Sequence, residues 1–122
     1  MIVVTSSTIS GKRIVETLGL VRGTTVRAHH VGQDIIAYIR NLVGGEVEEY
    51  TKMLAEAREQ ALDRMSDEAE KLGANAIMDI RFGTSDIASG AAEVLVYGTA
   101  VIVEDDGVGR LAATERQGTP AP

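Results

Sequence analysis

The sequence predicts a single α+β domain in which two helices cover one face of a small, mostly antiparallel sheet. Segments rich in β-branched residues lie at both ends of the domain, with two helix-like segments between them, in the order ββ-αα-ββ. The 122 residues suffice for one hydrophobic core but not for two. The domain is expected over residues 1–104. Residues 105–122 have little apolar content and are expected to form a flexible C-terminal tail.

The strands are expected in four segments. Residues 1–4 are apolar and β-branched, and a turn is expected after them at Ser10-Gly11-Lys12. Residues 13–28 predict one long strand, or two joined at Gly23, and Gly19 predicts a bulge or a close backbone approach. Residues 76–82 and 93–103 predict the last two strands, with a loop of small residues over 83–92 between them.

Two helices are expected in the middle of the chain. Asp34 is placed to cap a short first helix, which ends at Gly44-Gly45. A longer helix is expected from Val47 to Leu72 and is ended by Gly73. Its inner stripe has helical spacing and is rich in alanine, so this helix can lie close to the sheet: Leu54, Ala57, Ala61, Met65, Ala69 and Leu72.

The final strand predicts self-association, because it is apolar on both faces. Alternation places Leu95, Tyr97, Val101 and Val103 on one face, and Val94, Val96, Ala100 and Ile102 on the other. A strand of this kind requires cover on both sides, and two helices are expected to cover only one of them. We therefore expect a second copy of the chain to cover the other face, since so large an apolar patch is unusual on a monomer. The alternative is that the sheet curls and hides its own interior.

Composition excludes several classes of protein. The net charge of −6, the scattered basic residues and the 3% aromatic content argue against nucleic-acid binding. The chain has no cysteine, so disulfides and thiolate metal sites are excluded. No apolar run approaches the ~20 residues of a membrane helix, and the start of the chain lacks the features of a signal peptide. A cytoplasmic location is expected, without a membrane partner.

Several segments together resemble one family. The chain is similar to the YbjQ-like family, a group of uncharacterised bacterial and archaeal proteins described as heavy-metal-binding, over nearly all of residues 1–103. The resemblance implies an α+β subunit assembled into a ring-like homopentamer, and it implies no reaction. The segments that carry it are Thr5-Ser6-Ser7-Thr8-Ile9-Ser10-Gly11, Arg13-Ile14-Val15-Glu16, Gly19, Asp34, Ile39-Arg40, Val43-Gly44-Gly45, Tyr50, Ala57-Arg58, Ala61, Leu72-Gly73-Ala74-Asn75-Ala76 and Tyr97-Gly98-Thr99-Ala100-Val101.

His29 and His30 are the candidate metal ligands, with Asp34 as a carboxylate partner. They are the only imidazoles in the chain, and a divalent metal ion is the one cofactor that the sequence leaves open. Adjacent residues of a strand point to opposite faces, so both histidines can bind one ion only from a loop. The simpler interpretation is a pair of exposed or interface histidines at the end of a strand.

Arg40 and Tyr50 are the candidate ligand-binding residues. They flank Gly44-Gly45, where a loop leading into a helix N-terminus can bind an anion. Glutamates just after these glycines complement the helix dipole themselves, so a tight corner between two helices is the competing interpretation.

The sequence contains no recognisable catalytic constellation. The leading hypothesis is a non-enzymatic homo-oligomeric scaffold or small-ligand-binding protein, with its sites between subunits. The alternative is a metal-binding or metal-stress protein that uses His29 and His30 with nearby carboxylates. An enzyme with an interface active site containing Arg40, Tyr50 or Glu16 also remains open.

Overall fold

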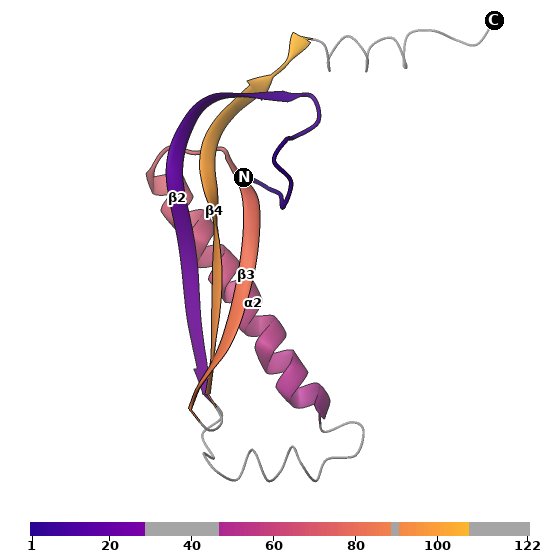
Figure 1. Cartoon of the computed structure of the whole chain (residues 1–122), viewed down its shortest axis with the longest axis vertical. Helices are drawn as coiled ribbons and strands as arrows, with labels where there is room; N and C mark the ends of the chain where they lie inside the picture. Colours follow the sequence, from indigo (N-terminus) through magenta and orange to yellow (C-terminus); the bar gives the residue numbers. More distant parts are fainter. Residues whose placement is uncertain (29–46, 89–90, 108–122) are drawn as a thin grey trace, which may run out of the picture.

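A computed structural model of the chain describes residues 1–28, 47–88 and 91–107. Its elements are β1 (Ile2–Val3), β2 (Lys12–Ala28), α2 (Val47–Lys71), β3 (Ala76–Ala88) and β4 (Ala91–Asp105). The strands form one mixed sheet in the order β1-β3-β4-β2, in which only β1 and β3 are parallel. Three long strands lie side by side, and α2 crosses one face of them diagonally (Figure 1). The predicted α+β class is confirmed, with one helix packed on a four-stranded sheet.

The segment predicted as one long strand or two is a single strand, β2, and the bulge predicted at Gly19 is present. Thr17 lies opposite Val101, but the next pair is Gly19 with Ala100, so one extra residue is inserted in β2. Gly19 has φ = 114°, a conformation that glycine adopts without the penalty that a Cβ atom would bring. The bulge therefore falls at the residue whose backbone accommodates it.

The loop predicted over residues 83–92 is wrong. β3 continues to Ala88 and β4 begins at Ala91, and the two strands pair through this region, for example Thr84 with Val94. The glycine, serine and threonine residues were interpreted as a loop because they lack the apolar alternation of a half-buried strand. Here β3 is exposed from Arg81 to Ile87, so backbone pairing with β4, and not side-chain burial, holds it in the sheet.

Two further predictions fall outside the described residues. The short helix expected after Asp34 lies within residues 29–46, and residues 108–122 of the expected tail lie beyond the described part, although Asp105 at its start is the last residue of β4. Of the two helices expected on the sheet, the structure therefore describes only α2.

The inner stripe of α2 is confirmed at four of its six positions. Ala57, Ala61, Met65 and Ala69 have no exposed surface and pack on β2, β3 and β4 in the main core. Leu72 was predicted to belong to the stripe, but it is 49% exposed. The reason is that α2 ends at Lys71 and Gly73 follows with φ = 86°, so the chain has turned away from the helix axis there.

The helix lies unusually close to the sheet at Gly23 of β2. A Cβ atom at this position would lie 1.9 Å from the carbonyl oxygen of Ala61 and 2.7 Å from the amide nitrogen of Met65. Both are backbone atoms of α2, so no side-chain rotation can make room. Alanine on the helix and glycine on the strand together permit this contact.

The opposite face of the sheet is partly covered by the first residues of the chain. Ile2, Val4 and Ile9 pack against a second cluster of buried residues, which contains Met78 and Val103. Val4 fixes this segment to β3, because its amide donates to the carbonyl of residue 77 (3.0 Å) and its carbonyl accepts from residue 80 (3.2 Å). The expectation that no part of the chain covers the second face is therefore wrong at this end of the sheet, because the N-terminal segment folds back over it.

Candidate functional site

The residues predicted from the sequence to form a site lie mostly outside the described part of the chain. His29, His30, Asp34 and Arg40 belong to residues 29–46, and Tyr50 lies in the first turn of α2. The proposed metal site and ligand site therefore remain predictions. Within residues 1–28, 47–88 and 91–107, no group of three or more histidine, aspartate or glutamate side chains is placed to hold a metal ion.

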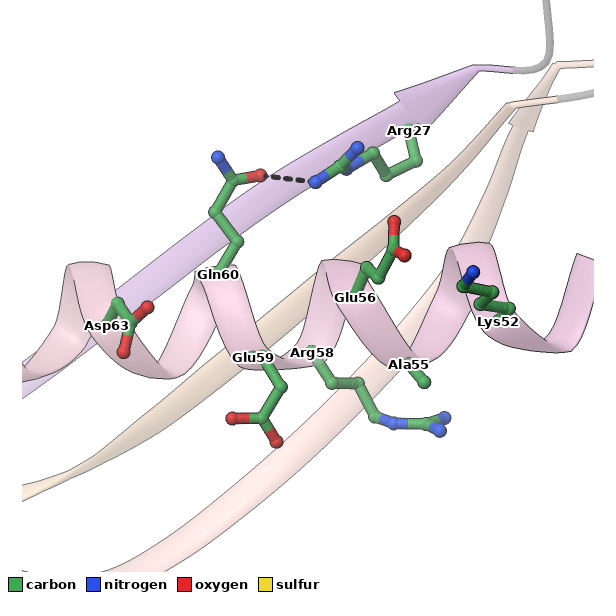
Figure 2. Close-up of a pocket in the computed structure, with 8 residues that line it drawn as sticks. All are labelled: Arg27, Lys52, Ala55, Glu56, Arg58, Glu59, Gln60 and Asp63. Atoms are coloured by element: carbon green, nitrogen blue, oxygen red, sulfur yellow. Dashed lines mark hydrogen bonds between the residues drawn. The ribbon is translucent and has the colours of Figure 1, made fainter.

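A wide surface groove of about 600 Å³ lies between the outer side of α2 and the end of β2. Figure 2 shows Arg27 reaching from β2 toward Gln60 of the helix, and its Nη2 donates to the Gln60 amide oxygen at 3.1 Å. The remaining lining is Lys52, Ala55, Glu56, Arg58, Glu59 and Asp63. Three cationic and three acidic side chains thus share the groove, so its net charge selects neither an anion nor a cation.

Two buried polar atoms lie on the helix-facing side of β2 beside this groove. The hydroxyl oxygen of Thr25 and Nε of Arg27 have no hydrogen-bond partner among the described residues. Thr25 is 1% exposed, and residues two apart on a strand face the same side. A buried donor without a hydrogen bond lowers the stability of the fold by about 1–3 kcal/mol, so we expect an ordered water molecule to hydrogen-bond to these atoms. We assign the Arg27 region a structural role, in which the guanidinium joins β2 to α2.

A second candidate surface is the uncovered part of the sheet on the side opposite α2. Leu20, Val26 and Tyr97 are 64%, 55% and 42% exposed, and Leu95 is half-buried. In the register between β2 and β4, Leu20 pairs with Thr99 and Thr24 pairs with Leu95. Paired residues, and residues two apart on one strand, point to the same side of a sheet, so all four side chains lie on one face. We call Leu20, Val26, Leu95 and Tyr97 the open sheet face.

Charged residues of both signs lie within the open sheet face. Arg22 pairs across the strands with Tyr97, and Glu93 pairs with Val26. The open sheet face therefore carries charges of both signs beside its apolar side chains.

A third candidate is a pocket of about 170 Å³ under the N-terminal segment, which we call the N-terminal pocket. Its apolar wall consists of Ile9, Ile14, Met78 and Val103, and its polar wall of Ser7, Thr8 and Lys12. Residues 7–9 come from the segment that folds over the sheet, Lys12 and Ile14 from β2, Met78 from β3 and Val103 from β4. The pocket is thus assembled from four separate parts of one chain.

Sequence analysis did not identify this pocket as a site, although Ser7, Thr8 and Ile9 belong to the Thr5–Gly11 segment that carries the family resemblance. The hydroxyls of that segment belong to no recognisable catalytic constellation in the sequence. Its structural role was hidden because the partners of the segment, such as Ile77 and Asp79, lie about seventy residues later. Asp79 is the one residue whose pattern could have indicated an irregularity here, because it is polar and lies between the buried Met78 and Ile80.

In the described residues, fold and surface together define a small mixed-sheet α+β domain with one tightly packed helix and a partly uncovered apolar sheet face. None of the described helices is long and apolar enough to cross a membrane. The family model with the description "Putative heavy-metal-binding" matches residues 1–104. The chain belongs to this YbjQ family, also designated UPF0145 or DUF74.

Relatives occur in both archaea and bacteria. A UPF0145 protein of Thermococcus kodakarensis is 57% identical over 106 residues, which cover 87% of this chain and 94% of that protein. A UPF0145 protein of Dehalococcoides mccartyi is 54% identical over 104 residues, covering 85% of this chain and all of that protein. Among solved structures, a protein of unknown function from Pediococcus pentosaceus, of the DUF74 family, is similar with a TM-score of 0.58. It is 18% identical, covers 85% of this chain and 98% of its own, and supports the fold alone.

Proposed function

We propose that the protein is a homo-oligomer whose subunits meet through the open sheet face, and that it acts as a scaffold or as a small-ligand-binding protein. The observation that carries the proposal is the exposure of Leu20, Val26 and Tyr97 on one face of a sheet whose other face packs against α2. Burying a large apolar side chain stabilises an interface by about 1.5–3 kcal/mol, so several residues repeated on each subunit supply a substantial driving force.

The proposed partner is a second copy of this chain. In a closed ring each subunit presents this face to a different surface of its neighbour, and Arg22 and Glu93 supply charges of both signs for that contact. A ring of five subunits is the assembly that the family resemblance implies. In such a ring, ligand sites would lie between subunits, where Arg40 and Tyr50 are the residues we expect to contribute.

Native mass spectrometry of the untagged protein, purified without chelators, tests the proposal. A chain of 12.9 kDa is expected to appear at five times that mass, and any additional mass would identify a retained ligand or metal. A protein that remains monomeric at micromolar and higher concentrations would contradict the proposal.

A second candidate function is metal binding, which the description of the family favours. His29 and His30 are its expected ligands, with Asp34 nearby. Isothermal calorimetry with Zn²⁺, Cu²⁺ and Ni²⁺ is expected to give saturable heats that disappear in a His29→Ala/His30→Ala double variant. Equal heats from both proteins would exclude the histidines as the site.

A further inference from the structure

We propose that the N-terminal pocket binds a short-chain carboxylate, with the carboxylate on Lys12 and Thr8 and the aliphatic part against Ile14, Met78 and Val103. This inference goes beyond the proposed function, whose ligand sites lie between subunits. The pocket lies within one subunit, so its occupancy and the self-association of the chain are measured separately.

The backbone around the pocket is held in place by an irregularity of β3. Met78 pairs with Thr99 of β4, but the next pair is Arg81 with Tyr97, so β3 contains an extra residue at this point. Asp79 lies in this bulge with φ = 54°, in the left-handed region that few residues other than glycine occupy. Bulges of this kind are frequent beside binding sites, because they redirect one side chain out of the regular alternation.

The redirected Asp79 side chain fixes one polar residue of the pocket. Its Oδ1 accepts a hydrogen bond from the Ser7 hydroxyl at 2.6 Å, and its amide donates to the carbonyl of Ser6 at 3.1 Å. Arg81 adds a third link, because its Nη1 donates to the carbonyl of Thr5 at 3.1 Å. The segment that carries Ser7 and Thr8 is therefore positioned before a ligand arrives, which lowers the entropic cost of binding.

The polar wall offers both donors and an acceptor. Lys12 forms an ion pair with Asp105 through Oδ1, and an ammonium group has three donors, so two remain for a ligand. The Thr8 hydroxyl is able to donate as well. The Ser7 hydroxyl already donates to Asp79, and toward the pocket it can therefore only accept. An anionic head group fits Lys12 and Thr8, and a hydroxyl on the ligand fits Ser7.

The size of the pocket limits the ligand to a short molecule. A volume of about 170 Å³ corresponds to roughly six water molecules at ~30 Å³ each, and so to a ligand of about that many non-hydrogen atoms. The apolar wall requires an aliphatic part, and Lys12 is the only charged residue in the lining. A four-carbon carboxylate satisfies both requirements, and we expect its 2-hydroxy form to bind more tightly through Ser7.

Protein-observed NMR titration tests this assignment with butyrate, 2-hydroxybutyrate, butyramide and octanoate as the probes. Butyrate and 2-hydroxybutyrate are expected to cause saturable shifts of the resonances of Ile9, Ile14 and Val103, with 2-hydroxybutyrate the tighter of the two. Butyramide lacks the charge and octanoate exceeds the volume, so both are expected to bind at least about tenfold more weakly.

Two matched variants separate recognition by Lys12 from a general effect on the sheet. Lys12→Met removes the ammonium but keeps an apolar stem, and we expect butyrate binding to weaken roughly tenfold or more. Arg13→Met is the control, because Arg13 also forms an ion pair between β2 and β4, with Glu104 at 2.9 Å, but does not line the pocket. We expect the Arg13→Met protein to bind butyrate like the wild type.

Three results would overturn the inference: no saturable shift with any carboxylate, equal binding of butyrate and butyramide, or unchanged binding in Lys12→Met. The mass of the assembly, measured on the same samples, distinguishes these failures from failure of the proposed oligomer. An intact assembly without butyrate binding rejects only the pocket, and a monomer that binds butyrate rejects only the self-association.

Discussion

Replacing Gly23 by alanine is expected to lower the free energy of unfolding by about 3 kcal/mol or more, the upper end of the range for overpacked positions. The added methyl group would lie 1.9 Å from the carbonyl oxygen of Ala61 and 2.7 Å from the amide nitrogen of Met65. Because both atoms belong to the backbone of α2, the helix as a whole has to move away from β2. That movement also loosens the contacts of Met65, which has no exposed surface in the native protein.

Gly83→Ala is the matched control for this prediction. Gly83 also lies in a strand, β3, but a Cβ atom there would have no other atom within 4 Å. We expect a change within about 0.5 kcal/mol, as for ordinary surface substitutions. Denaturant unfolding of the three proteins at one fixed concentration provides the comparison, since self-association would add its own stability. If both alanine variants unfold like the wild type, α2 does not lie against β2 at Gly23.

Replacing Leu20 and Val26 together by lysine is expected to dissociate the oligomer. Both side chains are more than half exposed in a single subunit, so the fold of the subunit loses little when they change. In an assembly they would be buried, and two charges per subunit would then be placed in an apolar interface. The dissociation constant is expected to rise at least about a hundredfold, which light scattering after size-exclusion chromatography detects as a shift toward the monomer.

Leu72→Lys is the control for the removal of an exposed apolar side chain. Leu72 is 49% exposed and lies just after α2, away from the open sheet face. Its replacement is expected to leave the assembly intact. An unchanged molar mass in the Leu20→Lys/Val26→Lys variant would instead place the interface elsewhere on the subunit.

Much of the fold followed from local patterns in the sequence. The alanine-rich stripe of α2 and the bulge at Gly19 were predicted, because helical periodicity and glycine conformation are local properties. The second half of β3 was not predicted, since its strand conformation depends on pairing with β4 and its side chains are largely exposed. Local propensity cannot show a pairing partner, which explains why Gly83 and its neighbours were assigned to a loop.

The candidate sites were harder to predict than the fold, for a related reason. The N-terminal pocket depends on hydrogen bonds between residues 4–7 and residues 77–81, and no spacing within either segment indicates the other. The two-sided apolar pattern of β4 did predict an exposed sheet face. It overestimated the extent of that face, because Ile2, Val4 and Ile9 cover the end that contains Val101 and Val103.

The most direct test of the proposed self-association is the reactivity of a single thiol placed in the open sheet face. The chain has no cysteine, so Leu20→Cys and, as a control on the exposed side of α2, Asp67→Cys each carry one reporter. At concentrations where the protein is assembled, we expect the thiol at position 20 to react with a maleimide far more slowly than the thiol at position 67. Dilution to the monomer should remove that difference. Equal rates in the assembled protein would contradict the proposal that subunits meet through this face.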